Sequence, residues 1–213
     1  MKAGKTDLAA MAGILFCMVI SFWPILFTDQ VIRAPDILNE YYWSALRLAQ
    51  QSFAELFTFR LQAIWDIYGN GGNTLDGGGQ VNQFLIWQGL LYKLLPLPAA
   101  VAWFILLYLF VAASGIYAWC RAVGTSRLAA LIAGLIFALA PETATLINAG
   151  HVLKIATISF APWAFFCLAK AYQEKRLVWF LATGSVLAVQ FFHTHWQIAY
   201  YTCLAIGLYG LFH

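Results

Sequence analysis

Long apolar runs separated by short polar turns dominate the pattern of this chain. Runs of about 20 residues match the hydrocarbon core of a bilayer when they coil as helices. Helices are also expected because lipid offers no hydrogen-bond partners, so each span must satisfy its own backbone groups. The pattern predicts an all-α integral membrane protein with about six transmembrane helices. The apolar runs are 8–27, 98–120, 126–149, 152–171, 177–193 and 195–213.

The first run follows Lys2 and Lys5, as the core of a signal peptide would. It is long enough to cross a membrane, however, and no small-residue cleavage site follows it. We therefore expect an uncleaved first span with a cytoplasmic N-terminus. Farther along the chain, Pro141 and Gly150 predict that the third run breaks or bends near its far end.

The segment 29–97 is a long polar loop after the first span. From Ile37 to about Trp65 its apolar residues recur at helical spacing, and polar residues such as Glu40 lie on the opposite face. This pattern is typical of amphipathic helices that lie along a membrane surface. The glycine-rich stretch 69–79 is expected to be a loop, and a second amphipathic stretch, 80–95, leads back to the membrane.

The composition agrees with this architecture. The chain is 62% hydrophobic and only 10% charged, whereas soluble domains have about 25% charged residues. The four cysteines lie within apolar runs without metal-ligand spacing, which is typical of small buried hydrophobic residues. The net charge of +3 gives no sign of nucleic-acid binding, and we expect no nucleic-acid partner.

The distribution of charge predicts an orientation. With the N-terminus in the cytoplasm, the short inner turns carry the basic residues Arg121, Arg127, Lys175 and Arg176. The 29–97 loop then lies outside, with four basic and six acidic residues. This is the positive-inside pattern of membrane proteins.

Polar residues at membrane depth are costly, so they are candidates for a functional site. The predicted topology gathers most of them at the outer face, in three groups along the chain. They are Asp36 and Glu40 after the first span, His151 and Lys154 between the third and fourth spans, and His193, His195 and Gln197 between the fifth and sixth.

Each group also has an ordinary structural role. Asp36 could cap a helix N-terminus, and His151 with Lys154, three residues apart, could be an interfacial anchor. His193 and His195 could belong to a polar turn. Two histidines and a carboxylate can bind a metal, but this spacing at a turn is weak evidence, and we predict no metal site.

Taken together, the groups suggest a reaction at the membrane surface. Asp36, helped by Glu40 one turn later, could act as a general base on a hydroxyl acceptor. His151 and Lys154 supply positive charge and N–H donors for a phosphate group at headgroup depth. His193, His195 and Gln197 would line the same pocket.

Three short segments carry a resemblance to a known family. They are Ser126 to Leu131, then Gly150-His151 with Lys154 and the following Ala161-Pro162-Trp163, and His195-Trp196-Gln197 with Tyr200-Tyr201. With the Pro35-Asp36 start of the outer loop, they resemble the GT-C membrane glycosyltransferases. The closer likeness is to the N-terminal part of bacterial YfhO-type proteins.

The resemblance implies a GT-C fold in the bacterial cytoplasmic (inner) membrane. It also implies transfer of a sugar from a polyprenyl-phosphate donor to an acceptor on the outer side. Asp36 matches the catalytic acid of the family's first loop, and His151 and Lys154 match a donor-phosphate site. The chain departs from the family in its glycine-rich stretch 69–79, where acceptor recognition is expected, and in its short length.

The transferase hypothesis has two rivals. One is a non-catalytic accessory or structural subunit with the same fold. The other is a lipid or ion transporter, which would need deeper charges and paired broken helices.

No cofactor is predicted apart from the lipid-linked sugar donor as substrate, and the need for a divalent metal stays open. Expected partners are membrane lipid, that donor, and other membrane subunits. Because the last run reaches His213 without a polar exit, we expect 1–213 to be one GT-C-like module of a longer or split protein.

Overall fold

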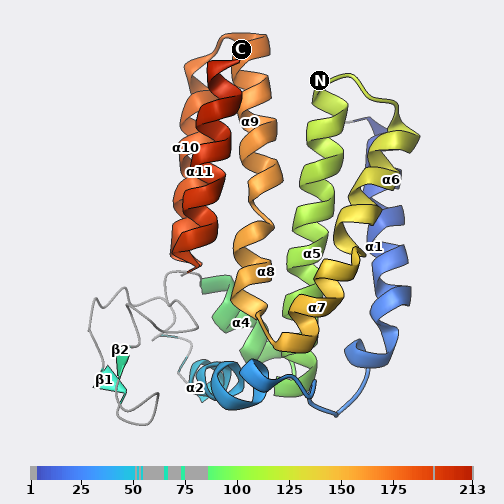
Figure 1. The fold of residues 1–213 in the computed structure, drawn as a ribbon. Helices are drawn as coiled ribbons and strands as arrows, with labels where there is room; N and C mark the ends of the chain where they lie inside the picture. The colour runs from blue at the N-terminus through green and yellow to red at the C-terminus, as the bar shows by residue number, and fades with distance from the viewer. Residues whose placement is uncertain are drawn as a thin grey trace.

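The computed structural model describes residues 4–50, 52, 54, 65–66, 73–74, 86–193 and 195–212. Its described residues are almost entirely helical (Figure 1). A pair of two-residue strands, β1 (Trp65–Asp66) and β2 (Asn73–Thr74), is antiparallel. The helices are α1 (Lys5–Leu26), η1 (Ile37–Tyr41), α2 (Tyr42–Gln50), α4 (Ile86–Leu94), α5 (Leu97–Ala122), α6 (Arg127–Ala138), α7 (Pro141–Ala149), α8 (Val152–Ile158), α9 (Ala161–Glu174), α10 (Leu177–Phe192) and α11 (Trp196–Leu211).

The protein is an all-α membrane protein. Within the described residues, four helical segments are long and apolar enough to cross a bilayer. Two of these segments are single helices, and the other two each consist of a pair of consecutive helices. They are Lys5–Leu26, Leu97–Ala122, Arg127–Ala149 and Val152–Glu174. α10 is a shorter apolar helix.

The two paired segments are broken, and one of the breaks was predicted. The third run breaks between α6 and α7, where Pro141 occupies the first position of the new helix. Proline is tolerated there because the first N–H groups of a helix have no intrahelical partner. A second break, at Ser159 and Phe160, divides the fourth run into α8 and α9. The sequence analysis predicted no break within this run, 152–171, although Pro162 lies in the first turn of the new helix.

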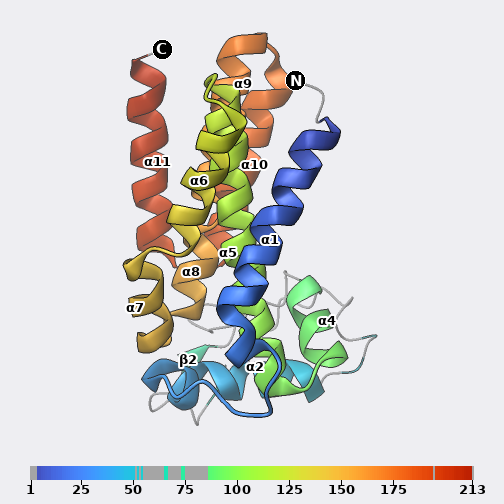
Figure 2. The ribbon, with the colours of Figure 1, turned by 90° about the vertical axis from the view of Figure 1, so that its right-hand side faces the viewer.

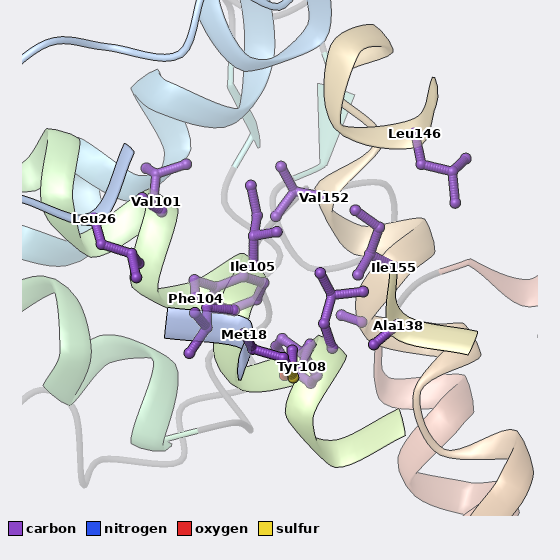
Figure 3. Close-up of a cluster of buried hydrophobic side chains, with 14 of the residues drawn as sticks. Met18, Leu26, Val101, Phe104, Ile105, Tyr108, Ala138, Leu146, Val152 and Ile155 are labelled. Atoms are coloured by element: carbon purple, nitrogen blue, oxygen red, sulfur yellow. The ribbon is translucent and has the colours of Figure 1, made fainter. Parts of the chain in front are cut away.

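The long helix α5 is the centre of the bundle. Within the apolar part of α5, two-thirds of the residues are buried inside the bundle, compared with 17% of the residues in the apolar part of α1. Figure 3 shows a cluster of buried side chains that α5 forms with α1, α6, α7 and α8. On another side of α5, the indole Nε1 of Trp163 in α9 donates to the carbonyl of Val111 at 2.8 Å. The same ring fills the space beside Gly115.

Helix α2 lies across one end of the bundle, near the start of α5, in both views (Figures 1 and 2). η1 leads directly into α2. The prediction of a helix from Ile37 is confirmed as far as Gln50. Most of the remaining stretch to Trp65 lies outside the described residues.

Two contacts join α2 and its neighbour η1 to α4. The buried hydroxyls of Tyr41 and Tyr92 are hydrogen-bonded to each other. Burial raises the pKa of both phenols well above the usual value, so both keep their protons. Lys93 Nζ donates to the carbonyl of Ala49 at 3.0 Å, near the C-terminal end of α2. The described helices before and after the glycine-rich segment, η1, α2 and α4, therefore form one layer, which we call the surface layer.

The opposite end of the bundle holds an acid that the sequence analysis did not single out. Asp7, in the first turn of α1, is 7% exposed. Its Oδ1 accepts a hydrogen bond from the hydroxyl of Tyr117 at 2.7 Å and from Nε of Arg127 at 3.3 Å. Nε of Arg121 lies 3.9 Å from the same oxygen. These two arginines were expected only to anchor the inner face, but they also join α1 to α5 and α6.

Gly134→Ala should destabilise the bundle. The added Cβ would lie 2.7 Å from the backbone oxygen of Ala113, which cannot move without shifting α5. We expect a loss of about 1–3 kcal/mol in the free energy of unfolding. Gly184→Ala in α10 is the matched control, since nothing lies within 4 Å of the added Cβ, and it should cost nothing. Thermal unfolding in detergent, followed by circular dichroism, compares the two, and equal transition temperatures would contradict the close α5–α6 contact.

Candidate functional site

Asp36 and His151, which lie far apart in the sequence, are in direct contact. The Nδ1 atom of His151 lies 2.9 Å from Oδ2 of Asp36. Each side chain remains 44% exposed, so the pair is open to a ligand. Asp36 has helical backbone angles and directly precedes η1, and His151 is the N-cap of α8. The contact therefore joins the start of the surface layer to the turn between α7 and α8.

Gly150 explains why the two segments can approach so closely. It ends α7 in the left-handed conformation, with φ of 91°, which glycine adopts without strain. The N–H groups of Gly150 and His151 both donate to the carbonyl of Leu146, at 3.0 and 2.9 Å. A Cβ at position 150 would lie 2.6 Å from the backbone nitrogen of Ile37 and 3.0 Å from Cβ of Asp36. The backbone of the α7–α8 turn thus packs directly on the residue that carries the carboxylate.

Positive charge lies beside this pair. Lys154 follows His151 by three residues on α8, so both lie on the same side of that helix. Lys154 is half-buried and has no ion-pair partner in the described part of the chain. His195, the N-cap of α11, interacts electrostatically with both Lys154 and His151. Its Nδ1 atom is buried without a hydrogen-bond partner.

The structure thus brings together four of the predicted residues: Asp36, His151, Lys154 and His195. An anionic group such as a phosphate could accept charge-assisted hydrogen bonds from Lys154 and from the imidazole of His195. Within the described residues, no three His, Cys, Asp or Glu side chains are grouped closely enough to hold a metal ion.

Two other predicted residues have different surroundings. Gln197 is exposed near the start of α11, and its Nε2 donates to the hydroxyl of Tyr201 at 2.8 Å. Glu40 belongs to η1, but its side chain lies outside the described residues. Neither residue has a described contact with the Asp36–His151 pair.

His193 belongs to the core rather than to this surface. Its side chain is 1% exposed. Nδ1 donates to the carbonyl of Val189 at 2.7 Å, which leaves Nε2 to accept from the hydroxyl of Tyr108 at 2.5 Å. Because both ring nitrogens have protein partners, we leave His193 out of the candidate site.

A buried polar group near His193 was not foreseen. Gln190, which is 0% exposed, donates through Nε2 to the carbonyl of Thr157 and to the hydroxyl of Thr202, at 2.8 and 3.2 Å. It therefore connects α10 to α8 and α11 near the break before α9. A glutamine within an apolar run could have indicated a buried polar contact, but the sequence could not show which helices Gln190 would contact.

Gly150→Ala should separate the pair and destabilise the fold. Gly124 provides a matched control, because its φ of 94° is nearly the same but nothing lies within 4 Å of an added Cβ. The left-handed conformation alone should cost about 1–2 kcal/mol in either variant. Gly150→Ala should cost about 1–3 kcal/mol more, because its Cβ meets the backbone of Ile37. Thermal unfolding measures both, and equal losses would show that the turn does not pack closely on Asp36.

The comparisons with known proteins identify a family. Residues 89–213, which include His151, Lys154 and His195, match the family model described as 6-pyruvoyl-tetrahydropterin synthase related domain, membrane protein. Asp36 precedes the matched segment. No curated protein and no solved structure matches the chain. Since the match covers more than half of the sequence, this chain belongs to the 6-pyruvoyl-tetrahydropterin synthase related family of membrane proteins.

Proposed function

We propose that this chain is a GT-C-type glycosyltransferase module. In this proposal it transfers a sugar from a polyprenyl-phosphate donor to an acceptor on the outer side of the bacterial cytoplasmic membrane. The observation that carries the proposal is the half-exposed Asp36–His151 pair, with Lys154 and His195 beside it. Such a site offers both a proton acceptor for a hydroxyl group and positive charge for a phosphate group.

The proposed reaction uses the two kinds of residue differently. Glycosyl transfer needs a base near the acceptor hydroxyl, and the Asp36–His151 pair supplies one. The polyprenyl phosphate leaves with additional negative charge, which Lys154 and His195 would stabilise. Glu40 and Gln197 stay predicted contacts for the sugar or the acceptor.

The proposed topology has six spans. α10 and α11, at 16 residues each, are about 24 Å long and would complete the bundle as the fifth and sixth spans. The N-terminus would lie in the cytoplasm, because the end of α5 and the starts of α6 and α10 lie away from α2 (Figures 1 and 2). These helix ends carry Arg121, Arg127 and Arg176. The layer of η1, α2 and α4 would then lie along the outer leaflet.

One observation favours transport as a rival function. Two of the spans are broken, and broken spans also occur in transporters. Here, however, the broken spans are consecutive, α6–α7 and α8–α9, rather than placed in two related halves. At the second break the hydroxyls of Thr157 and Ser159 donate to carbonyls of their own helix, Leu153 and Ile155. The polar groups at the Asp36 end are better arranged for surface chemistry.

Lys154→Ala should weaken donor binding. The variant removes a charge-assisted contact worth about 1.5–3 kcal/mol, which corresponds to a roughly 10- to 150-fold higher Kd for a polyprenyl-phosphate sugar. Arg176→Ala, which removes an exposed charge at the other end of the bundle, is the control and should bind normally. Binding and sugar transfer in proteoliposomes measure the effect. If the unaltered chain neither binds the donor nor transfers the sugar, the accessory-subunit hypothesis is favoured instead.

The proposed orientation can be tested separately. In a variant without the four native cysteines, a cysteine at Asp29 should react with an impermeant thiol reagent applied from outside the cell. A cysteine at Arg176 should react only after the membrane is permeabilised. Asp29 follows the end of α1 near α2, and Arg176 is the N-cap of α10 at the other end of the bundle. Labelling of both positions from the same side would exclude this topology.

A further inference from the structure

Oδ2 of Asp36 lies 2.9 Å from Nδ1 of His151, and this contact suggests separate roles for the two residues in the reaction. The proposal rests on the transferase function above. We propose that Nε2 of His151 is the atom that takes the acceptor proton, and that Asp36 is a positioning residue that holds the imidazole. The sequence analysis, in contrast, assigned the role of base to Asp36.

The geometry determines which ring nitrogen carries the proton. Oδ2 of Asp36 lies 2.9 Å from Nδ1 of His151, and a carboxylate oxygen at this distance stabilises the ring form that carries its proton on Nδ1. In the neutral ring, Nε2 then carries the lone pair. Nε2 makes no hydrogen bond within the part of the chain that the structure describes, and 44% of the side chain is exposed.

The other described histidines differ from His151 in this respect. Both nitrogens of His193 have protein partners. Nδ1 of His195 is buried and has no partner, and no carboxylate among the described residues contacts that ring. Among these three, only His151 combines a carboxylate beside one nitrogen with a second nitrogen that has no described protein partner. An imidazole is also a stronger base than a carboxylate, which suits proton abstraction near neutral pH.

The backbone holds this arrangement from both sides. His151 is fixed as the N-cap of α8, directly after the left-handed Gly150. The backbone nitrogens of Asp36 and Ile37 and Cβ of Asp36 fill the space beside Gly150, so the residue that carries the carboxylate cannot withdraw without moving η1. The position of the ring therefore depends on the packing of the surface layer on the bundle.

The proposed step is balanced. The acceptor oxygen forms a bond to the anomeric carbon of the sugar, and the bond between that carbon and the phosphate oxygen breaks. The acceptor proton passes to Nε2, and polyprenyl phosphate leaves with the electron pair of the broken bond. The imidazolium is stabilised by Asp36, and the proton then passes to water at the surface. Among the described residues, His195 lies close enough to Lys154 and His151 to interact electrostatically with both, and Lys154 and His195 would face the leaving phosphate in this arrangement.

One arm of the test needs no enzymatic activity. Nitrogen-15 NMR of the full chain in nanodiscs, labelled at histidine, reports which nitrogen of each neutral ring is protonated. His151, assigned from the His151→Gln spectrum, should carry its proton on Nδ1. In Asp36→Asn this preference should be lost, and in Asp36→Glu it should be retained. A proton on Nε2 of His151 in the unaltered protein would overturn the inference.

The second arm compares turnover. His151→Gln should lose at least about 100-fold in sugar transfer across the pH range, because it removes the base. Asp36→Asn should lose less and keep a rate that rises with pH, and Asp36→Glu should recover part of it. The reverse order, with Asp36→Asn inactive and His151→Gln active, would make Asp36 the base. If the unaltered chain transfers no sugar, the proposed function fails, while the NMR result still decides the arrangement of the pair.

Discussion

In lipid every backbone N–H and C=O group must find its partner within the protein, and the architecture follows from this constraint. It favours helices wherever the chain is apolar. It also requires that each break in a span be closed locally. The turn between α7 and α8 meets this requirement with Gly150 and His151, whose N–H groups both bond to Leu146. The turn is compact enough to lie against Asp36, so the closure of a helix end also forms the candidate site.

Close packing at a few small residues makes the rest of the arrangement possible. Gly134 allows α6 to lie against the backbone of α5 at Ala113, and Gly115 allows the ring of Trp163 to lie against α5. The surface layer is fixed to the same helix by Tyr41 and Tyr92, which pack on Phe104 with ring centroids 5.8 and 6.0 Å apart. The position of Asp36 thus depends on contacts that reach into the core.

Each end of the bundle holds an acid beside basic groups, but the two ends differ in how many protein partners these groups have and in how exposed they are. At one end, the oxygens of Asp7 accept from Gly4, Tyr117 and Arg127, and the acid is nearly inaccessible. At the other end, Asp36 and His151 are half-exposed, and Lys154 lacks a carboxylate partner among the described residues. The first arrangement suits structure and the second suits ligand binding, which is why the proposed chemistry belongs to the end that carries η1 and α2.

The sequence by itself determined the helical class, the membrane environment, the break at Pro141 and the gathering of polar residues at one end. It could do so because long apolar runs and their interruptions are local properties of the chain. It could not distinguish His193 from His195, or foresee the bonds of Gln190 and the pairing of Asp36 with His151. A helix in lipid is apolar on all sides, so its pattern does not show which face meets a neighbour. Only the packing of the helices decided which histidine became a core residue and which nitrogen of His151 contacts Asp36.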